Sequence, residues 1–185
     1  RRSQGLSCLF SSDSYISSAS VSHCMASKTP TEAERIASEE SVREIETGRR
    51  TWTGAALGGL AGGLVFGLLL QSLGMMPVIG SLYGMESVAV GWVAHLFHSV
   101  VFALVFAAAV VWTDYRDAGP AQLAALGTGY GVLLWLVAAA VVMPLWMSAI
   151  GLAAPAIPNL DVNSLVGHVL YGALLGAVFA FARRR

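Results

Sequence analysis

Three histidines stand inside apolar stretches of this chain, where an imidazole side chain is unusual. His95 and His98 lie three residues apart in the stretch 89–112, and this spacing places both on one face of a helix. His168 lies in another apolar stretch, 164–182. Ionisable side chains inside a membrane are costly and usually face a bundle interior or a cavity. The three histidines are therefore the first candidates for a ligand or proton site.

Two interpretations of these histidines stay open. As a functional site, imidazoles with methionine thioethers suit copper, whereas imidazoles alone suit zinc, haem or a proton relay. As structural residues, neutral histidines hydrogen-bond across helices for about 0.6–2 kcal/mol, and methionines fill gaps in the packing. No cofactor is predicted outright, and copper, zinc and haem are the alternatives. The candidate site consists of His95, His98, His168, Tyr171, Met143 and Met147.

The composition places these residues in a membrane domain. Hydrophobic residues make up 56% of the 185 residues and charged residues only 12%, against about 25% in soluble domains. Of the 11 Lys and Arg residues, only Arg116 lies within residues 51–182. A helix needs about 20 apolar residues to span a membrane. We predict an all-α, four-transmembrane-helix bundle, with spans at residues 52–73, 89–112, 121–146 and 164–182.

The positions of the basic residues predict the orientation in the membrane. Arg49 and Arg50 precede the first span, Arg116 lies in the second loop, and residues 183–185 are all arginine. The first and third loops contain no Lys or Arg. Because basic residues stay on the cytoplasmic side, both termini are expected in the cytoplasm, with the protein in the plasma membrane. The three histidines then lie at similar depth in the outer leaflet.

The second and fourth spans resemble each other. One reads WVAHLFHSVVFALVFA and the other LVGHVLYGALLGAVFA. When the two are aligned, His95 matches His168 and Phe106 matches Phe179. This match predicts two helical hairpins related as a parallel repeat about the membrane normal. Chance similarity between apolar helices is the alternative.

Glycines recur at intervals of four residues in the first, third and fourth spans. Small residues at this spacing let helix backbones approach closely in a membrane. The pattern fits packing inside one bundle and equally a homo-oligomer face. The predicted packing residues are Gly58, Gly62, Gly127, Gly131, Gly172 and Gly176.

A proline lies near the end of the third span. Pro144 cannot donate a backbone hydrogen bond, so it frees the carbonyl of Ala140, four residues earlier. We expect the helix to be kinked at this point.

The chain ahead of the spans divides into two parts. Residues 1–24 are rich in Arg and Ser and are interpreted as a disordered or mis-annotated extension, with an organellar transit peptide as the alternative. Residues 25–50 form a charged cytoplasmic tail, and Thr31 with Glu34 predicts the start of a short helix that ends at Gly48. The membrane domain covers residues 51–182 and a basic cytoplasmic end covers 183–185.

Residues 50–182 carry a specific order of motifs: GAALGGLAGGLVFG, MPVIGSLYG, GWVAHLFHS, YGVLLW, MPLWMSAIG and SLVGHVLYGALLGAVFA. This order resembles small four-helix integral membrane proteins of haloarchaea, a family with no established activity. The resemblance implies fold and lineage. Members sometimes carry the label histidine kinase, but these residues contain no Gly-rich nucleotide motif and no ATP-binding domain.

The favoured function is a non-enzymatic structural or accessory membrane component. A small transporter or a metal- or haem-binding membrane protein that uses the histidines is one alternative, and a signalling subunit is another. Catalysis is not predicted, because the spans hold no nucleophile–base pair and no paired carboxylates. The expected partners are the lipid bilayer, further copies of the chain and a soluble partner of the tail. A net charge of zero implies no general attraction to nucleic acid.

Overall fold

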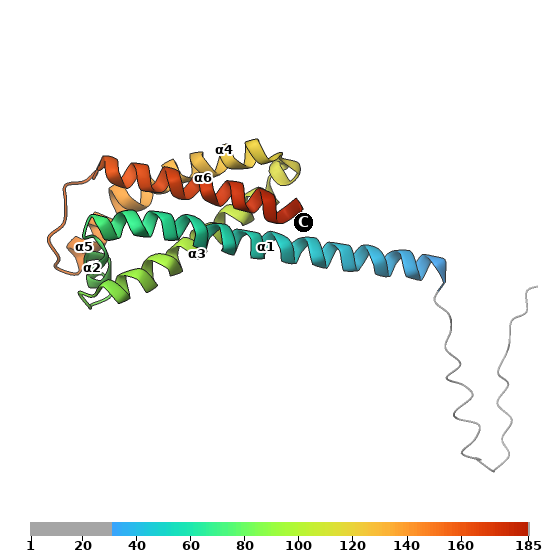
Figure 1. Ribbon diagram of the computed structural model, residues 1–185, viewed down its shortest axis with the longest axis horizontal. Helices are drawn as coiled ribbons and strands as arrows, with labels where there is room; N and C mark the ends of the chain where they lie inside the picture. Colours follow the sequence, from blue (N-terminus) through green and yellow to red (C-terminus); the bar gives the residue numbers. More distant parts are fainter. Residues whose placement is uncertain (1–30, 185) are drawn as a thin grey trace, which may run out of the picture. The chain divides into compact units, whose positions relative to one another are not determined.

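The computed structural model describes residues 31–184, apart from the side chains of Asp114 and Arg116. The expectations for residues 1–24 lie outside the described residues. Within the described part the chain is helical and contains no strand, and four helices are long and apolar enough to cross a membrane (Figure 1). The predictions of an all-α fold and of four spans are confirmed for these residues.

Four long helical segments and two short ones make up this part of the chain. The long segments are α1 (Glu32–Ser72), α3 (Val88–Trp112), α4 (Pro120–Leu134) with its continuation, and α6 (Val162–Arg184). The continuation of α4 is a π-helical segment (Trp135–Val142) followed by α5 (Met143–Ala149). Helix α2 (Met76–Ser81) lies in the first loop, and a 3₁₀ turn (Asp114–Asp117) lies in the second.

The expected stop at Gly48 is wrong, because α1 runs without a break from Glu32 to Ser72. A glycine in a helix interior costs only about 1 kcal/mol relative to alanine, and the surrounding Glu, Arg and Ala residues favour the helix. Nothing lies within 4 Å of the position that a Cβ of Gly48 would occupy, so no packing contact forces a turn there. The tail helix and the first span are therefore one continuous helix.

The predicted capping box at the start of α1 is confirmed. The Thr31 backbone N–H donates to Glu34 Oε2 at 2.6 Å, and the Glu34 N–H donates to Thr31 Oγ1 at 3.3 Å. These hydrogen bonds from Thr31 lower the pKa of the exposed Glu34 carboxyl group, which lies outside the apolar part of α1. The cap therefore depends on a charged carboxylate.

Acid is expected to weaken this helix start. Because the pKa of Glu34 is lower in the helix than in the unfolded chain, the cap contributes fully above the ordinary glutamate pKa of about 4.3. Its contribution is lost as the pH falls through the lowered value. We expect the protection of the Arg35 amide, which donates to Thr31 O at 3.0 Å, to fall over this range in hydrogen exchange. The same pH dependence in Glu34→Gln would contradict the assignment.

Close backbone contacts hold α4 against α6. A Cβ at Gly127 would lie 2.9 Å from the Cα of Gly176, and one at Gly131 would lie 3.3 Å from the Cα of Gly172. Only glycine leaves enough room at these four positions. Gly127, Gly131, Gly172 and Gly176 thus lie at the contact between α4 and α6 within one chain.

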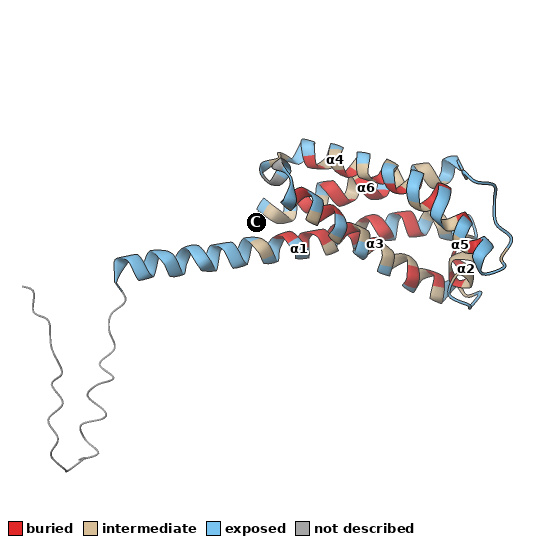
Figure 2. Cartoon of the chain, turned by 180° about the vertical axis from the view of Figure 1, so that it is seen from behind, coloured by how far each residue is buried: buried red, intermediate tan, exposed pale blue. Residues whose placement is uncertain are grey.

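Helix α1 uses two glycine faces. Gly58 and Gly62 face α6, where added Cβ atoms would meet the side chains of Leu175 and Tyr171 at 3.0 Å. The adjacent face of α1 contacts α3, and a Cβ at Gly59 would lie 2.6 Å from the Cβ of Ala103. In Figure 2 buried residues of α1, α3, α4 and α6 line the inside of the bundle. The helix is therefore packed on two sides, which explains why glycines occur there in two rows.

The outward faces of the four long helical segments are apolar. Large exposed hydrophobic side chains occur on each, among them Leu68, Phe97, Leu133 and Phe181. In water, exposed apolar surface of this extent would be an aggregation liability. In lipid the same surface needs no cover, which agrees with the membrane-spanning composition of the helices.

The third span is irregular next to Pro144. The freed carbonyl of Ala140 accepts a hydrogen bond from the backbone N–H of Asn159 at 2.9 Å, so the predicted loss of its helical partner is confirmed. Trp135–Val142 is wound as a π-helix just before this proline. A loop residue thus satisfies a carbonyl group that lipid could not.

Candidate functional site

His95 of α3 forms a hydrogen bond between helices. Its Nε2 lies 2.9 Å from the carbonyl oxygen of Gly63 on α1. A carbonyl can only accept, so a neutral His95 carries its proton on Nε2 and leaves Nδ1 with a lone pair. The ring lies edge-on to Phe66, with 5.4 Å between ring centroids. A Cβ at Gly63 would lie 2.6 Å from the Cβ of Ser99, so this glycine permits the close approach of α3 to α1.

Both nitrogens of His98 have partners. Nδ1 lies 2.8 Å from the carbonyl oxygen of Ala94, one turn earlier, and Nε2 lies 3.0 Å from the hydroxyl of Tyr83 in the first loop. The proton of neutral His98 is therefore on Nδ1, and the tyrosine hydroxyl donates to Nε2. Burial raises the pKa of Tyr83, which keeps this donor protonated at neutral pH. His98 thus connects the first loop to the bundle.

His168 of α6 resembles His98 in its bonding, but none of residues 31–184 provides a second partner. Its Nδ1 lies 2.7 Å from the carbonyl oxygen of Ser164, so this nitrogen carries the proton of the neutral ring. Nε2 is left with a lone pair. The ring centroid lies 4.7 Å from that of Phe66, which therefore contacts both His95 and His168.

Phe66 is a site residue that the sequence analysis missed. It is buried on α1, and its ring fills the space beside Gly167 of α6. A phenylalanine in a spanning helix is ordinarily a lipid-facing or core residue, so its type gave no signal. The four-residue glycine spacing on α1, which brings the helices together around this ring, was the available clue.

Two hydroxyl groups complete the polar cluster. The Tyr171 hydroxyl of α6 donates to the carbonyl oxygen of Ser99 on α3 at 2.5 Å. The Ser99 hydroxyl donates to the carbonyl oxygen of His95 at 2.8 Å. Each hydroxyl has a single proton, so both donors are already used.

These residues line a small, partly open cavity of about 70 Å³. Its lining consists of Phe66, His95, His98, Ser99, Phe102, Leu134, His168 and Tyr171. The structure therefore brings four of the predicted site residues together. Met143 and Met147 are not part of the lining; Met147 is buried in α5 and Met143 is half-buried.

The geometry bears on the metal and haem alternatives. In the described part of the chain, no three His, Cys, Asp or Glu side chains come together in a group that could hold a metal ion. Zinc sites use three or four protein ligands, and the cavity offers only two imidazole nitrogens that lack a hydrogen bond. A cavity of about 70 Å³ is also far smaller than the pockets of about 300–1,000 Å³ that enclose large organic ligands.

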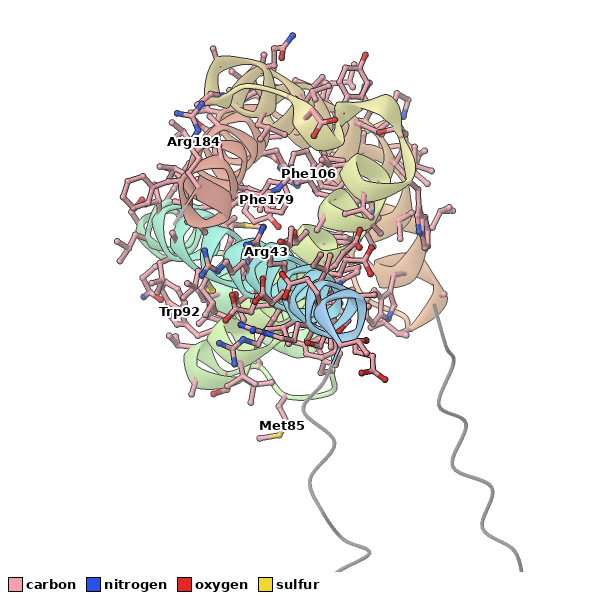
Figure 3. The ribbon with its side chains drawn as sticks, turned by 90° about the vertical axis from the view of Figure 1, so that its right-hand side faces the viewer. Arg43, Met85, Trp92, Phe106, Phe179 and Arg184 are labelled. Atoms are coloured by element: carbon pink, nitrogen blue, oxygen red, sulfur yellow. The ribbon has the colours of Figure 1, made fainter. Side chains whose placement is uncertain are left out.

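The bundle is filled with aromatic rings about three helical turns beyond the histidines. Phe106 of α3 and Phe179 of α6 lie edge to face, with 5.6 Å between ring centroids. Figure 3 shows these two rings inside the bundle, between α3 and α6. The Arg183 guanidinium lies 5.4 Å from the ring centroid of Phe179. This apolar layer separates the cavity from the C-terminal end of α6.

Comparisons of this chain with protein-family models, with curated proteins and with solved structures found no significant match. The function is therefore argued from the residues and their geometry alone.

Proposed function

We propose that the protein is a small non-enzymatic component of the plasma membrane, structural or accessory to a larger assembly. One observation carries this proposal: three polar side chains inside the bundle donate hydrogen bonds to backbone carbonyl groups of a neighbouring helix. His95 bonds α3 to α1, Tyr171 bonds α6 to α3, and the Tyr130 hydroxyl of α4 donates to the carbonyl oxygen of Phe102 on α3 at 2.9 Å. Such bonds, together with close glycine packing, are the means by which membrane helices associate.

Stability and ligand content test this role. In His95→Phe the bond to Gly63 is lost, and we expect the free energy of unfolding to fall by about 0.6–2 kcal/mol in mild detergent. Elemental analysis and an absorption spectrum of untagged wild-type protein are expected to show no stoichiometric copper, zinc or haem. A bound metal or haem that is lost in a folded His95→Phe/His168→Phe protein would contradict the proposal.

The proposed orientation places both termini in the cytoplasm. It is supported by the basic residues at Arg49, Arg50 and 183–185, because loops with Lys and Arg stay inside. In a Cys8→Ser/Cys24→Ser background, which removes the two native thiols, we expect a membrane-impermeant maleimide to label Met85→Cys in intact cells, and to label Tyr115→Cys only after the cells are opened. Both side chains are exposed in loops, so the protein itself leaves the two positions similarly accessible to the maleimide. The reverse pattern would overturn the orientation.

The proposed repeat is supported by equivalent contacts in the two hairpins. Gly59 faces Ser99 and Ala103 in the first hairpin, and in the second Gly127 faces the aligned positions, Gly172 and Gly176. By these contacts, Gly59 and Gly63 of the first hairpin correspond to Gly127 and Gly131 of the second. The aligned residues Phe106 and Phe179 also touch each other, as a two-fold axis along the bundle requires.

A second candidate function is a small-ligand binding or transport protein. The observation that favours it is the cavity, where His95 and His168 each keep one ring nitrogen without a hydrogen-bond partner among residues 31–184, an arrangement that is costly inside a membrane. A soluble partner of the tail, assembly into homo-oligomers and haloarchaeal lineage stay predictions from the sequence.

A further inference from the structure

The polar atoms around the histidine cavity form an unusual set. The side chains of Ser99 and Tyr171 donate to backbone carbonyl groups, and each of the three imidazoles has one nitrogen bonded to a carbonyl. Every N–H and O–H donor that the lining side chains possess in their neutral forms is thus already used. What remains are acceptors, chiefly Nδ1 of His95 and Nε2 of His168.

His98 does not add to these acceptors. Its Nδ1 is bonded to Ala94 and its Nε2 receives the Tyr83 hydroxyl. The lining also contains no Asp, Glu, Lys or Arg. The titratable groups at the cavity are therefore the three imidazoles and Tyr171, contributed by α3 and α6, while α1 and α4 contribute the apolar Phe66 and Leu134.

A cavity that offers hydrogen-bond acceptors and no free donors favours a guest that donates hydrogen bonds. An anion or a purely accepting molecule would meet only lone pairs and aromatic faces. A small guest with several N–H or O–H groups would satisfy both unbonded imidazole nitrogens at once. The volume of about 70 Å³ admits a guest of water size, since one water needs about 10–15 Å³ of such space.

We propose that the cavity between His95 and His168 binds a small hydrogen-bond donor of water size, namely water or ammonium. The guest donates to Nδ1 of His95 and Nε2 of His168 and lies beside the ring of Phe66. Aromatic faces next to a cation add attraction, which makes ammonium compatible with a site that has no carboxylate. This inference goes beyond the structural role proposed above, which needs no guest.

Nitrogen-15 spectra of histidine-labelled protein in lipid nanodiscs test the proposal on the wild-type chain. We expect ammonium chloride, titrated at constant pH, to move the imine ¹⁵N signals of His95 and His168 upfield and to saturate, whereas potassium chloride leaves them unchanged. If ammonium has no effect but magnetisation passes from water to these imine nitrogens, the guest is water. Absence of both effects would overturn the proposal, as would an equal shift with potassium, which has no donor.

The chain offers a matched pair of variants for the same experiment. His168→Phe removes one unbonded nitrogen, and we expect the response of His95 to ammonium or water to be lost. Tyr130→Phe removes an interhelical hydrogen bond of the same bundle but changes no residue of the cavity lining, and we expect the response to persist. A response lost in Tyr130→Phe as well would show that the signals report the packing of the bundle and would overturn the proposal. Stability changes in His95→Phe test the structural role separately, so the two proposals can fail independently.

Discussion

Gly127→Ala is expected to lower the free energy of unfolding by about 1–3 kcal/mol, the usual cost of overpacking a tight core. The added Cβ would lie 2.9 Å from the Cα and the backbone nitrogen of Gly176. These are backbone atoms of α6 and cannot rotate away as a side chain would. The helices must separate instead, which loses contact along the whole interface. Unfolding in detergent, followed by tryptophan fluorescence, would measure the change.

Gly129→Ala is the matched control. Gly129 lies on the same helix, two residues further on, but is exposed and has nothing within 4 Å of its Cβ position. Alanine is the better helix former by about 1 kcal/mol in water, so this variant is expected to be neutral or slightly stabilising. Equal losses in Gly127→Ala and Gly129→Ala would show that the α4–α6 contact is not as close as described.

The close helix contacts could be predicted from the sequence because they depend on spacing alone. Gly127 and Gly131, four residues apart, lie on one face, and Gly129 between them does not, so the spacing distinguishes packed from exposed glycines. The same rule was insufficient on α1, where two adjacent faces are both packed. There the choice between Gly58 and Gly59 as the partner of α3 depends on how the helices are arranged.

The candidate site was predictable only in part. His95 and His168 were predicted as site residues because they occupy aligned positions and because an imidazole in an apolar helix is rare enough to be informative. The roles of Phe66 and Tyr83 follow from contacts between segments far apart in the chain, and an apolar ring or a loop tyrosine has no distinctive type or spacing. Met143 and Met147 were expected near the histidines because they lie near the outer end of the third span, at a similar depth in the membrane. Depth alone does not say which side of a helix a residue faces.

The helix around Gly48 shows a different limit. A glycine after a charged helix is a common stop signal, but it ends a helix only where a left-handed turn or a contact is available to replace the lost hydrogen bonds. Residues on both sides of Gly48 favour a helix, and the position has no neighbour within 4 Å. The helix propensity of the flanking residues therefore outweighs the glycine, and the helix continues into the first span.

Gly167→Ala is expected to disturb the histidine cavity more than any change at the histidines' own hydrogen bonds. The Cβ would overlap the Phe66 ring, one of whose carbon atoms would lie 2.8 Å away and others closer. The ring has little room to rotate, because it contacts both His95 and His168. We expect a loss of about 1–3 kcal/mol in the free energy of unfolding and displaced ¹⁵N signals for both histidines.

A smaller residue at position 66 should relieve this clash. Phe66→Leu alone leaves a gap and is expected to destabilise the bundle, but Gly167→Ala with Phe66→Leu should be more stable than the sum of the single changes predicts, by about 0.5–3 kcal/mol. The double-mutant cycle, measured by the same unfolding experiment, isolates the contact between α1 and α6 at this ring. Strict additivity would mean that the Phe66 ring moves aside at no cost, and that its contact with Gly167 is not as close as described.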